Sequence, residues 1–428
     1  VCRDLRLEDG TFWPLPIALD VSEEVSQSLE TGSALALRDV EGTLLAVLHV
    51  EEAWAADHEA EAIALCRTKD PGQPCAGRLL NETGAWYVGG RVEGVEMPHH
   101  YDFVERRASP AELRERFTKL GWRRIASFHT RKVMHRAEQE LTFAAARDLE
   151  AALLVQLNVA RTDYYDVSHY SRIRCGEALM GTYPHGTASL NLLPLARRGS
   201  GARDILLNAI VAQNFGCSHH LVRGGARGAD DALLSRAHGE LGFELVRTSE
   251  RIYLPDRDAF VSTDAVPEGA ATRALTSEDL EERLARGREL PSWFSYPEVV
   301  RELRRSSPPR SRQGFTVFFS GLPSSGKSTL ANVLLVKLLE MGSRPVTLLD
   351  GDIVRQNLSS ELGFSREHRN LNVARIGFVA SEITKNGGIA LCAPIAPYDA
   401  VRKQVRALIE PVGGFLLVHV ATPLEVCE

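Results

Sequence analysis

The stretch FTVFFSGLPSSGKSTL, residues 315–330, reads as an apolar strand, a turn bounded by glycines and the start of a helix. Its G-x-x-x-x-G-K-S spacing, from Gly321 to Ser328, is typical of a loop whose backbone N–H groups surround nucleotide phosphates. In such a loop the helix N-terminus adds positive potential, Lys327 bridges the outer phosphates and Ser328 ligates Mg²⁺. The alternative is a glycine turn that carries Lys-Ser by coincidence, which the flanking strand and helix disfavour. We expect ATP, bound with Mg²⁺, to contact Gly321, Leu322, Pro323, Ser324, Ser325, Gly326, Lys327, Ser328 and Thr329.

The next strand-like stretch, RPVTLLDGD at residues 344–352, ends in two carboxylates. In a parallel sheet its carboxyl end lies at the same edge as the phosphate-binding loop. Asp350 and Asp352 can therefore serve separate tasks, because one can hold Mg²⁺ through water while the other accepts a proton from a hydroxyl. A turn with two solvated aspartates is the alternative.

Several arginines follow within a region of almost balanced charge, with eleven basic and ten acidic residues between positions 314 and 428. Such a local cluster fits a small anionic co-substrate better than a polymer. A solvated helix face, with ion pairs to Glu361, Glu367 and Glu382, is the alternative for any single arginine. The cluster comprises Arg355, Arg366, Arg369 and Arg375, with Phe364 and Asn372 among them.

Composition restricts the class of protein. The chain has 428 residues, 44% of them hydrophobic, and a formal net charge of −6, which together predict about three domains and make nucleic acid an unsuitable main partner. Seven cysteines without a C-x-x-C pair argue against a disulfide framework and favour a reducing cytoplasm. No run of 18 apolar residues predicts a membrane span. Because the chain begins at Val1 and stops at Glu428 just after a strand-like run, we expect that either end is cut.

The predicted secondary structure changes along the chain. Residues 1–105 are rich in short alternating strands, with RDVEG as a hairpin turn. From 110 to 245 helices and strands alternate, which predicts a parallel sheet; one helix is expected over EQELTFAAARDLEAALLVQL, residues 138–157. Residues 276–305 predict two amphipathic helices, and RRSSPPRSRQG has the composition of a linker.

Residues 314–428 resemble adenylylsulfate (APS) kinase, which phosphorylates the 3′-hydroxyl of APS to give PAPS. The likeness is carried by GLPSSGKSTLA, LLDGDIVRQNLSSELGFSREHRNLNVARIG and APIAPYDAVRKQVR. It implies Asp352 as the catalytic base beside Lys327 and Asp350. Ala396 stands where some members have a phosphorylated serine, and direct in-line transfer needs no such residue. The family continues into a lid and a second adenine-stacking aromatic, which we expect to be missing after Glu428. The implied APS-binding residues are Arg355, Phe364, Arg369, Asn372 and Ile395.

Residues 1–305 resemble ATP sulfurylase, which joins sulfate to ATP. The likeness is carried by DGTFWPLPIALDVS, SHYSRIRCGEALMGTYPHGTASLNLLPLARRGSGARD, AIVAQNFGCSHHLV, RIYLPDRDAFVS and LARGRELPSWFSYPEVVRELR. The resemblance implies an α/β protein with the following parts: a β-rich PUA-like domain over 1–108, a Rossmann-type nucleotidyltransferase domain with a small closing subdomain over 109–305, a linker over 306–313, and a P-loop kinase with a parallel sheet over 314–428.

The family's Q-T-R-N-P-x-H-x-x-H motif is only partly present. Arg131 and His135 are kept, but His129 replaces the glutamine, Lys132 the asparagine and Glu138 the second histidine. A carboxylate one turn from His135 is expected to face the triphosphate as a like charge, and the loss of one donor to a developing oxyanion costs about 3 kcal/mol.

The family's second motif, G-R-D-H-A-G, is also altered. LVRGGARGADD, residues 221–231, places Gly224, Gly225 and Ala226 where Arg, Asp and His are expected. Three hypotheses follow: an APS kinase with an inactive, structural sulfurylase domain; a fully bifunctional enzyme; or an amino-terminal module that binds nucleotides and regulates the kinase. A homo-oligomer, either dimer or hexamer, is expected in each case.

The sequence does not predict a metal site at its paired histidines. His99-His100 and His219-His220 are adjacent pairs that lack a spaced third ligand.

Overall fold

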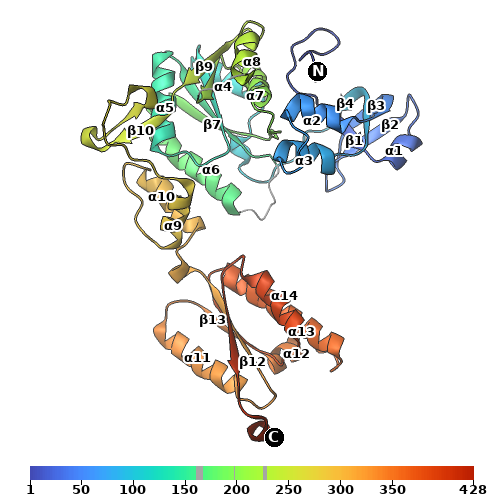
Figure 1. The fold of residues 1–428 in the computed structure, drawn as a ribbon, viewed down its shortest axis with the longest axis vertical. Helices are drawn as coiled ribbons and strands as arrows, with labels where there is room; N and C mark the ends of the chain where they lie inside the picture. The colour runs from blue at the N-terminus through green and yellow to red at the C-terminus, as the bar shows by residue number, and fades with distance from the viewer. Residues whose placement is uncertain (161–166, 197, 225–228) are drawn as a thin grey trace. The chain divides into compact units, whose positions relative to one another are not determined.

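The computed structural model describes residues 1–160, 167–196, 198–224 and 229–428, and it divides them into two compact units. The first unit contains Val1–Ala274 and Pro291–Glu302, and the second contains Leu275–Leu290 and Leu303–Glu428. Figure 1 shows the helices and strands of both units, which are described separately below. No described helix is long and apolar enough to cross a membrane.

The first unit begins with an antiparallel sheet in the order β1-β4-β3-β2. The predicted hairpin is confirmed, because β2 pairs with β3 around a turn in which the Asp39 carboxylate accepts the N–H groups of Glu41 and Thr43. A small core of Leu48, Val50 and Val88 lies on one face. The elements of this part are β1 (Leu19–Val21), α1 (Glu23–Ser28), β2 (Ala34–Arg38), β3 (Leu44–Ala55), α2 (His58–Cys66), α3 (Pro74–Asn81) and β4 (Trp86–Gly94).

A disulfide joins Cys66 at the end of α2 to Cys75 at the start of α3, with a Cα–Cα distance of 5.7 Å. The expectation of a chain without disulfides is therefore wrong at this pair. The spacing of nine residues carries no sequence signal, because the two cysteines meet only when the turn between the two helices brings them together.

A five-stranded parallel sheet in the order β7-β6-β5-β8-β9 forms the centre of the first unit, as the alternating pattern predicts. Its β6 strand is buried along almost all of its length. At the start of helix α4, Ser109 and Glu112 form a capping box, and Pro110 is the first helical residue. The elements are η1 (Val104–Arg106), α4 (Pro110–Lys119), β5 (Ile125–Thr130), α5 (Arg136–Asp148), β6 (Ala152–Asn158), α6 (Val167–Met180), β7 (Ala188–Leu193), α7 (Ala202–Asn214), β8 (His219–Arg223), α8 (Ala229–His238) and β9 (Glu244–Thr248).

The single helix expected over residues 138–157 is wrong. Helix α5 ends at Asp148, Glu150 takes a left-handed conformation with φ of 50°, and the chain continues as strand β6. A strand that is covered on both faces is apolar without alternation, so its sequence cannot be told from the end of a buried helix.

The two amphipathic helices predicted over residues 276–305 are confirmed as α9 and α10. Helix α9 groups with the second unit, whereas most of α10 groups with the first. The elements that follow β9 along the chain, up to the second unit's sheet, are β10 (Arg251–Leu254), η2 (Pro255–Arg257), β11 (Ala259–Ser262), η3 (Thr263–Ala265), α9 (Ser277–Ala285), α10 (Pro297–Ser306) and η4 (Arg310–Arg312).

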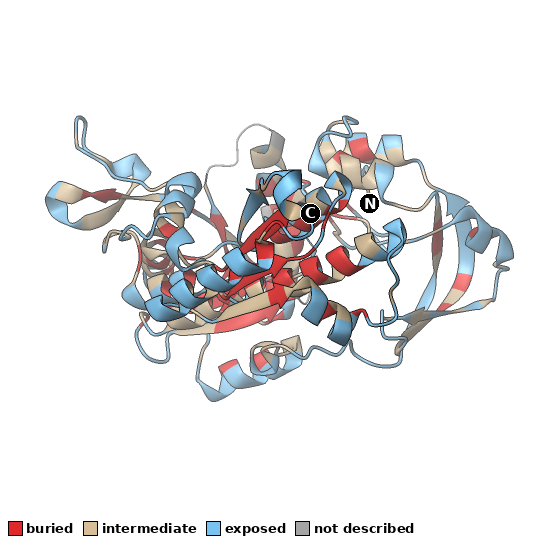
Figure 2. Ribbon diagram, turned by 90° about the horizontal axis from the view of Figure 1, so that it is seen from below, coloured by how far each residue is buried: buried red, intermediate tan, exposed pale blue. Residues whose placement is uncertain are grey.

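The second unit is built on a parallel sheet in the order β13-β14-β12-β15, in which the two central strands, β14 and β12, are buried. Figure 2 shows that buried residues concentrate in strands at the centre of the view. Helices pack on both sides: one core cluster centres on Phe318 and Ile376, and the other on Val317 and Ala331. The carboxyl ends of all four strands therefore meet at one edge, where α11 and α12 begin. The elements are β12 (Phe315–Gly321), α11 (Lys327–Met341), β13 (Val346–Asp350), α12 (Gly351–Leu358), α13 (Arg366–Lys385), β14 (Ile389–Ala393), α14 (Asp399–Ile409), β15 (Gly414–Val420) and α15 (Leu424–Cys427).

Candidate functional sites

The phosphate-binding loop connects β12 to α11 at the carboxyl edge of the second unit's sheet. Gly321 has a φ of 153°, and a Cβ atom there would lie 2.6 Å from the carbonyl oxygen of Val420, so only glycine fits. Ser324 and Gly326 take left-handed conformations, with φ of 61° and 91°. Helix α11 starts at Lys327, directly after this loop, so its free N–H groups belong to the same turn.

Lys327 is buried beside the loop, and its Nζ donates a hydrogen bond to the carbonyl oxygen of Leu322 at 2.6 Å. Burial lowers the pKa of this ammonium group, while the negative charge of Asp350 acts in the opposite direction. The ammonium group thus lies against the backbone of the phosphate-binding loop.

Ser328 and Asp350 lie together as the sequence predicts. The hydroxyl of Ser328 donates to Oδ2 of Asp350 at 2.7 Å, and Oδ1 of Asp350 accepts the backbone N–H of Asp352 at 3.0 Å. A hydroxyl beside a carboxylate fits Mg²⁺, which binds oxygen ligands and keeps several waters next to nucleotide phosphates. Asp352, in the first turn of α12, is exposed and carries no such partner on its carboxylate among the described contacts.

The predicted acceptor residues form a connected group between α12 and α13. The guanidinium of Arg355 lies over the ring of Phe364, 4.5 Å from its centroid, and also donates to the carbonyl oxygens of Leu362 and Gly363. Arg369 donates to the carbonyl oxygen of Phe364 at 3.0 Å. The Phe364 ring remains 74% exposed, so one face is available to a planar ligand.

Asn372 is buried, and its Oδ1 atom has no hydrogen-bond partner, which leaves this oxygen free to accept a hydrogen bond from a ligand. Arg375 instead pairs with Glu361 at 2.6 Å, so the ion-pair alternative is confirmed for this arginine. Arg366 lies over the ring of Tyr398. Ile395 is 44% exposed and Ala396 is buried beside it.

Sequence reasoning missed Arg402, which shapes the loop after β14. Its guanidinium donates to the carbonyl oxygen of Ala396 at 2.6 Å and pairs with Asp399 at 3.3 Å. The signal was present in APYDAVRKQVR, where an arginine three residues after the aspartate lies on the same face of a helix start.

A second pocket, of about 710 Å³, lies at the carboxyl edge of the first unit's parallel sheet. The lining includes Arg131, Lys132 and Arg223 as positive groups and Asp204 and Asp230 as negative groups. A pocket of this volume fits a small-molecule ligand such as a nucleotide.

The wall of this pocket contains two histidines, of which His220 is buried and His129 is half-buried. Nε2–H of His129 donates to Oε1 of Gln156 at 2.6 Å, and the His129 ring meets the ring of His220 edge-on at 4.8 Å. Burial lowers the pKa of His129 to about 4, and burial together with the neighbouring His129 lowers the pKa of His220. Neither ring supplies a positive charge to the pocket near neutral pH.

Replacing His129 with glutamine should make the first unit less sensitive to acid. Because the pKa of the folded group, about 4, lies below the unfolded value near 6.5, the neutral ring stabilises the fold above pH 6.5, and this contribution is lost as the pH falls towards 4. His129→Gln is therefore expected to reduce the loss of unfolding free energy between pH 6.5 and pH 4 by about 2 to 3 kcal/mol. Calorimetric melting of the first unit across this range measures the effect.

His185→Gln is the matched control, because His185 is an exposed histidine of the same unit. It should leave the pH dependence unchanged. An equal response of the two variants would contradict the role of burial at His129.

His135 and Glu138 form the start of α5. Nδ1 of His135 shares a hydrogen bond with the Ser295 hydroxyl at 3.0 Å, its ring lies 4.3 Å from that of Phe294, and burial lowers its pKa to about 4 against the charge of Glu138. Glu138 accepts the backbone N–H of His135 at 3.0 Å and pairs with Arg223 at 3.4 Å.

This arrangement corrects the expectation for Glu138. Its carboxylate is absent from the described residues that line the pocket, whereas Arg223 is among them. Glu138 therefore acts by neutralising a cation in the pocket wall, instead of facing the triphosphate alone. The pocket still loses positive charge, because Glu138 neutralises the guanidinium of Arg223.

The second altered motif lies mostly outside the described residues. Gly224 donates its N–H to the carbonyl oxygen of Thr248 at 3.1 Å and has a φ of 72°. Gly225 and Ala226 fall in the segment 225–228, which the structure does not describe.

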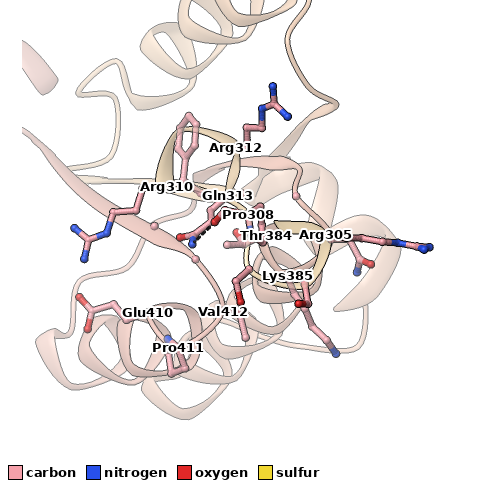
Figure 3. A pocket seen from close by; sticks show the side chains of 18 residues that line it. Arg305, Pro308, Arg310, Arg312, Gln313, Thr384, Lys385, Glu410, Pro411 and Val412 are labelled. Carbon is pink, nitrogen blue, oxygen red and sulfur yellow. Dashed lines mark hydrogen bonds between the residues drawn. The ribbon is translucent and has the colours of Figure 1, made fainter. Parts of the chain in front are cut away.

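A pocket of about 790 Å³ lies where the strands of the second sheet begin, at the end opposite the phosphate-binding loop (Figure 3). Figure 3 shows the charged ends of Arg305, Arg310 and Arg312 pointing in different directions, and Gln313 donates to the carbonyl oxygen of Pro308. Because these labelled charges do not converge on one point, the pocket gives no indication of an anion site. Over the described residues, no three His, Cys, Asp or Glu side chains form a metal-binding group.

The fold and the two sites define the class of protein. A glycine loop between a parallel strand and a helix, with one aspartate at the end of the next strand and another in the first turn of the helix that follows, is a P-loop phosphotransferase site. The first unit is an α/β domain with a nucleotide-sized pocket at its strand ends.

Comparison with known proteins narrows the class to a family. Three family profiles match consecutive parts of the chain: a PUA-like domain over residues 1–97, ATP-sulfurylase over 104–306 and adenylylsulphate kinase over 313–428. The chain is 44% identical to a sulfate adenylyltransferase of Neurospora crassa and 45% identical to one of Aspergillus terreus, in each case over all of this chain and 78% of the relative. The chain belongs to the sulfate adenylyltransferase (ATP sulfurylase) family, with an adenylylsulphate (APS) kinase domain in its carboxyl-terminal part.

A solved structure described as a hexameric APS kinase from Thiobacillus denitrificans is also similar. It shares 44% identity with this chain and a TM-score of 0.82, and the match covers 99% of this chain and 80% of that one. The PUA-like, ATP sulfurylase and APS kinase folds expected from the sequence are thereby confirmed in this order along the chain.

Proposed function

We propose that the chain is an APS kinase that transfers the γ-phosphoryl group of MgATP to the 3′-hydroxyl of APS, giving PAPS and ADP. The observation that carries this proposal is the Ser328–Asp350 pair in a P-loop, in the same unit as an exposed Phe364 ring that Arg355 covers on one face. The match of residues 313–428 to adenylylsulphate kinase supports the same acceptor. A coupled assay of ADP formation with MgATP and APS tests the proposal.

The roles of the side chains follow from their positions. The N–H groups of the loop and Lys327 hold the outer phosphates, and Asp352 takes the proton of the attacking 3′-hydroxyl. Ser328 and Asp350 would hold Mg²⁺, which neutralises charge that develops on the phosphates. Arg355, Arg369 and Asn372 would bind the polar groups of APS: Arg355 lies over the Phe364 ring, Arg369 contacts the Phe364 backbone, and Asn372 has a buried Oδ1 without a hydrogen-bond partner.

Phe364→Ala should weaken APS binding. Stacking of a base on an aromatic ring is worth about 1–3 kcal/mol, so KM for APS is expected to rise about tenfold or more while KM for ATP stays nearly constant. Steady-state kinetics with each substrate varied in turn measures the two values.

Phe378→Ala is the control for this variant, since Phe378 is a 60% exposed phenylalanine further along α13. It should change neither KM. If Phe364→Ala had the KM for APS of the unmodified protein, stacking on this ring would be refuted.

For the amino-terminal half, we propose that the sulfurylase fold is kept for structure and assembly while its catalytic activity is lost. Support comes from the side chains: His129 is held neutral, Lys132 is exposed in place of an asparagine, and Glu138 pairs with Arg223. The changes at His129 and Glu138 remove or redirect a positive group that would stabilise charge on a phosphate, and Lys132 puts a longer side chain in the place of the asparagine amide.

The second candidate is a fully bifunctional enzyme that makes PAPS from sulfate and ATP. The comparisons favour it over the inactive alternative, because curated relatives that match the whole chain are named sulfate adenylyltransferase. The persistence of a pocket of about 710 Å³ at the sheet edge also supports it. A third candidate, a nucleotide-sensing amino-terminal module, would use this same pocket without turnover.

We further propose a cytoplasmic homo-oligomer. The similar hexameric APS kinase favours six copies over two. Sedimentation of the purified full-length protein distinguishes a hexamer from a dimer.

A further inference from the structure

The residue Thr422 lies just beyond β15 and contacts the phosphate-binding loop. Its hydroxyl, which is partly buried, donates a hydrogen bond to the backbone carbonyl oxygen of Ser325 at 2.8 Å, across 97 residues of sequence. The loop also touches the end of β15, because the Cβ that Gly321 lacks would lie 2.6 Å from the carbonyl oxygen of Val420. The segment after β15 is therefore a support for the loop.

This hydrogen bond fixes the orientation of one peptide group. The Ser325 carbonyl and the Gly326 N–H belong to the same planar trans peptide, and in such a unit the C=O and N–H bonds point in opposite directions. A carbonyl that is held towards Thr422 directs the Gly326 N–H away from Thr422. Gly326 immediately precedes α11, where successive N–H groups form the phosphate cradle.

The peptide needs such a support because its neighbourhood is strained. Ser324 has a left-handed φ of 61°, which is unfavourable for a residue with a side chain, and Gly326 is left-handed as well. The preceding peptide, which carries the Ser325 N–H, is held only by a long hydrogen bond of 3.3 Å to the carbonyl oxygen of Leu322. The shorter bond from Thr422 comes from outside the loop and selects one orientation of the 325–326 peptide.

We infer that Thr422 is a positioning residue that holds the Ser325–Gly326 peptide with its N–H towards the bound nucleotide phosphates. It does not touch the nucleotide itself but acts through this backbone carbonyl. The catalytic part of this inference rests on the proposed kinase function. The effect on nucleotide binding does not depend on which acceptor is phosphorylated.

The test compares Thr422→Val, which removes the hydroxyl at almost constant shape, with Thr422→Ser, which keeps it. Calorimetric titration of the full-length protein with MgADP should show about tenfold weaker binding for Thr422→Val and nearly normal binding for Thr422→Ser, as expected for one lost hydrogen bond. In the kinase assay KM for ATP should rise by a similar factor while KM for APS stays constant. Thermal melting identifies a folding defect, and Thr422→Ala replaces the valine variant if that variant does not fold.

Unchanged MgADP binding by Thr422→Val, or equally weak binding by the serine and valine variants, would overturn the inference. The failure of the kinase proposal would look different: the unmodified protein would bind MgADP without phosphorylating APS. In that case the effect of Thr422→Val on MgADP binding would still decide the role of the threonine.

Discussion

Asp352→Asn is expected to lower kcat for APS-dependent ADP formation by about 10³-fold, which is within the usual contribution of a positioned general base. The reason is geometric: Asp350 is occupied by Ser328 and by the N–H of Asp352, whereas the Asp352 carboxylate lies exposed beside them in the first turn of α12. Asparagine keeps the shape but cannot take a proton. MgADP binding, measured by titration, should change little.

Asp399→Asn serves as the matched control. Asp399 is an exposed aspartate in the first turn of α14, where it pairs with Arg402 and Lys403. It should keep nearly full activity. An Asp352→Asn variant with kcat within about threefold of the unmodified protein would show that proton transfer is not its role.

Sulfate-dependent exchange of pyrophosphate into ATP is expected to be at least about 10²-fold slower than with the Neurospora crassa sulfate adenylyltransferase, because more than one donor is altered and each typically costs that factor. His129 cannot supply charge near neutral pH, and Arg223 is neutralised by Glu138. The assay uses the full-length protein with the Neurospora enzyme as positive control. Exchange within about tenfold of that control would establish the bifunctional candidate.

Replacing Glu138 with the family's histidine tests whether this one residue prevents sulfurylase activity. Glu138→His frees Arg223 and restores one residue of the motif, yet Lys132 and the altered 224–226 segment remain. The variant should therefore stay at the exchange rate of the unmodified protein. Recovery of exchange by this substitution alone would show that Glu138 was the main obstacle.

The phosphate-binding loop was predictable because its signal is local. Gly321, Gly326 and Ser328 are close in sequence, and the flanking strand and helix have their own hydrophobic patterns. The Asp350 contact was also predictable, because parallel strands bring their carboxyl ends to one edge. These features depend on short-range chemistry and on one rule of topology.

The errors concern contacts between distant residues and buried segments. Glu138 pairs with Arg223, which is 85 residues away in the sequence, and no pattern in either stretch predicts this pair. Strand β6 was read as helix because burial on both faces removes the alternation that marks a strand. No sequence pattern marks Thr422, because its partner is a backbone carbonyl that any residue could supply.

The central claim is phosphoryl transfer to APS, and one measurement tests it directly. Purified full-length protein, incubated with MgATP and with or without APS, is followed by separating the nucleotides and quantifying ADP and the phosphorylated product. We predict equal amounts of ADP and PAPS that appear only when APS is present. ADP formation that does not depend on APS, or the absence of PAPS from a protein that binds MgADP, would contradict the account.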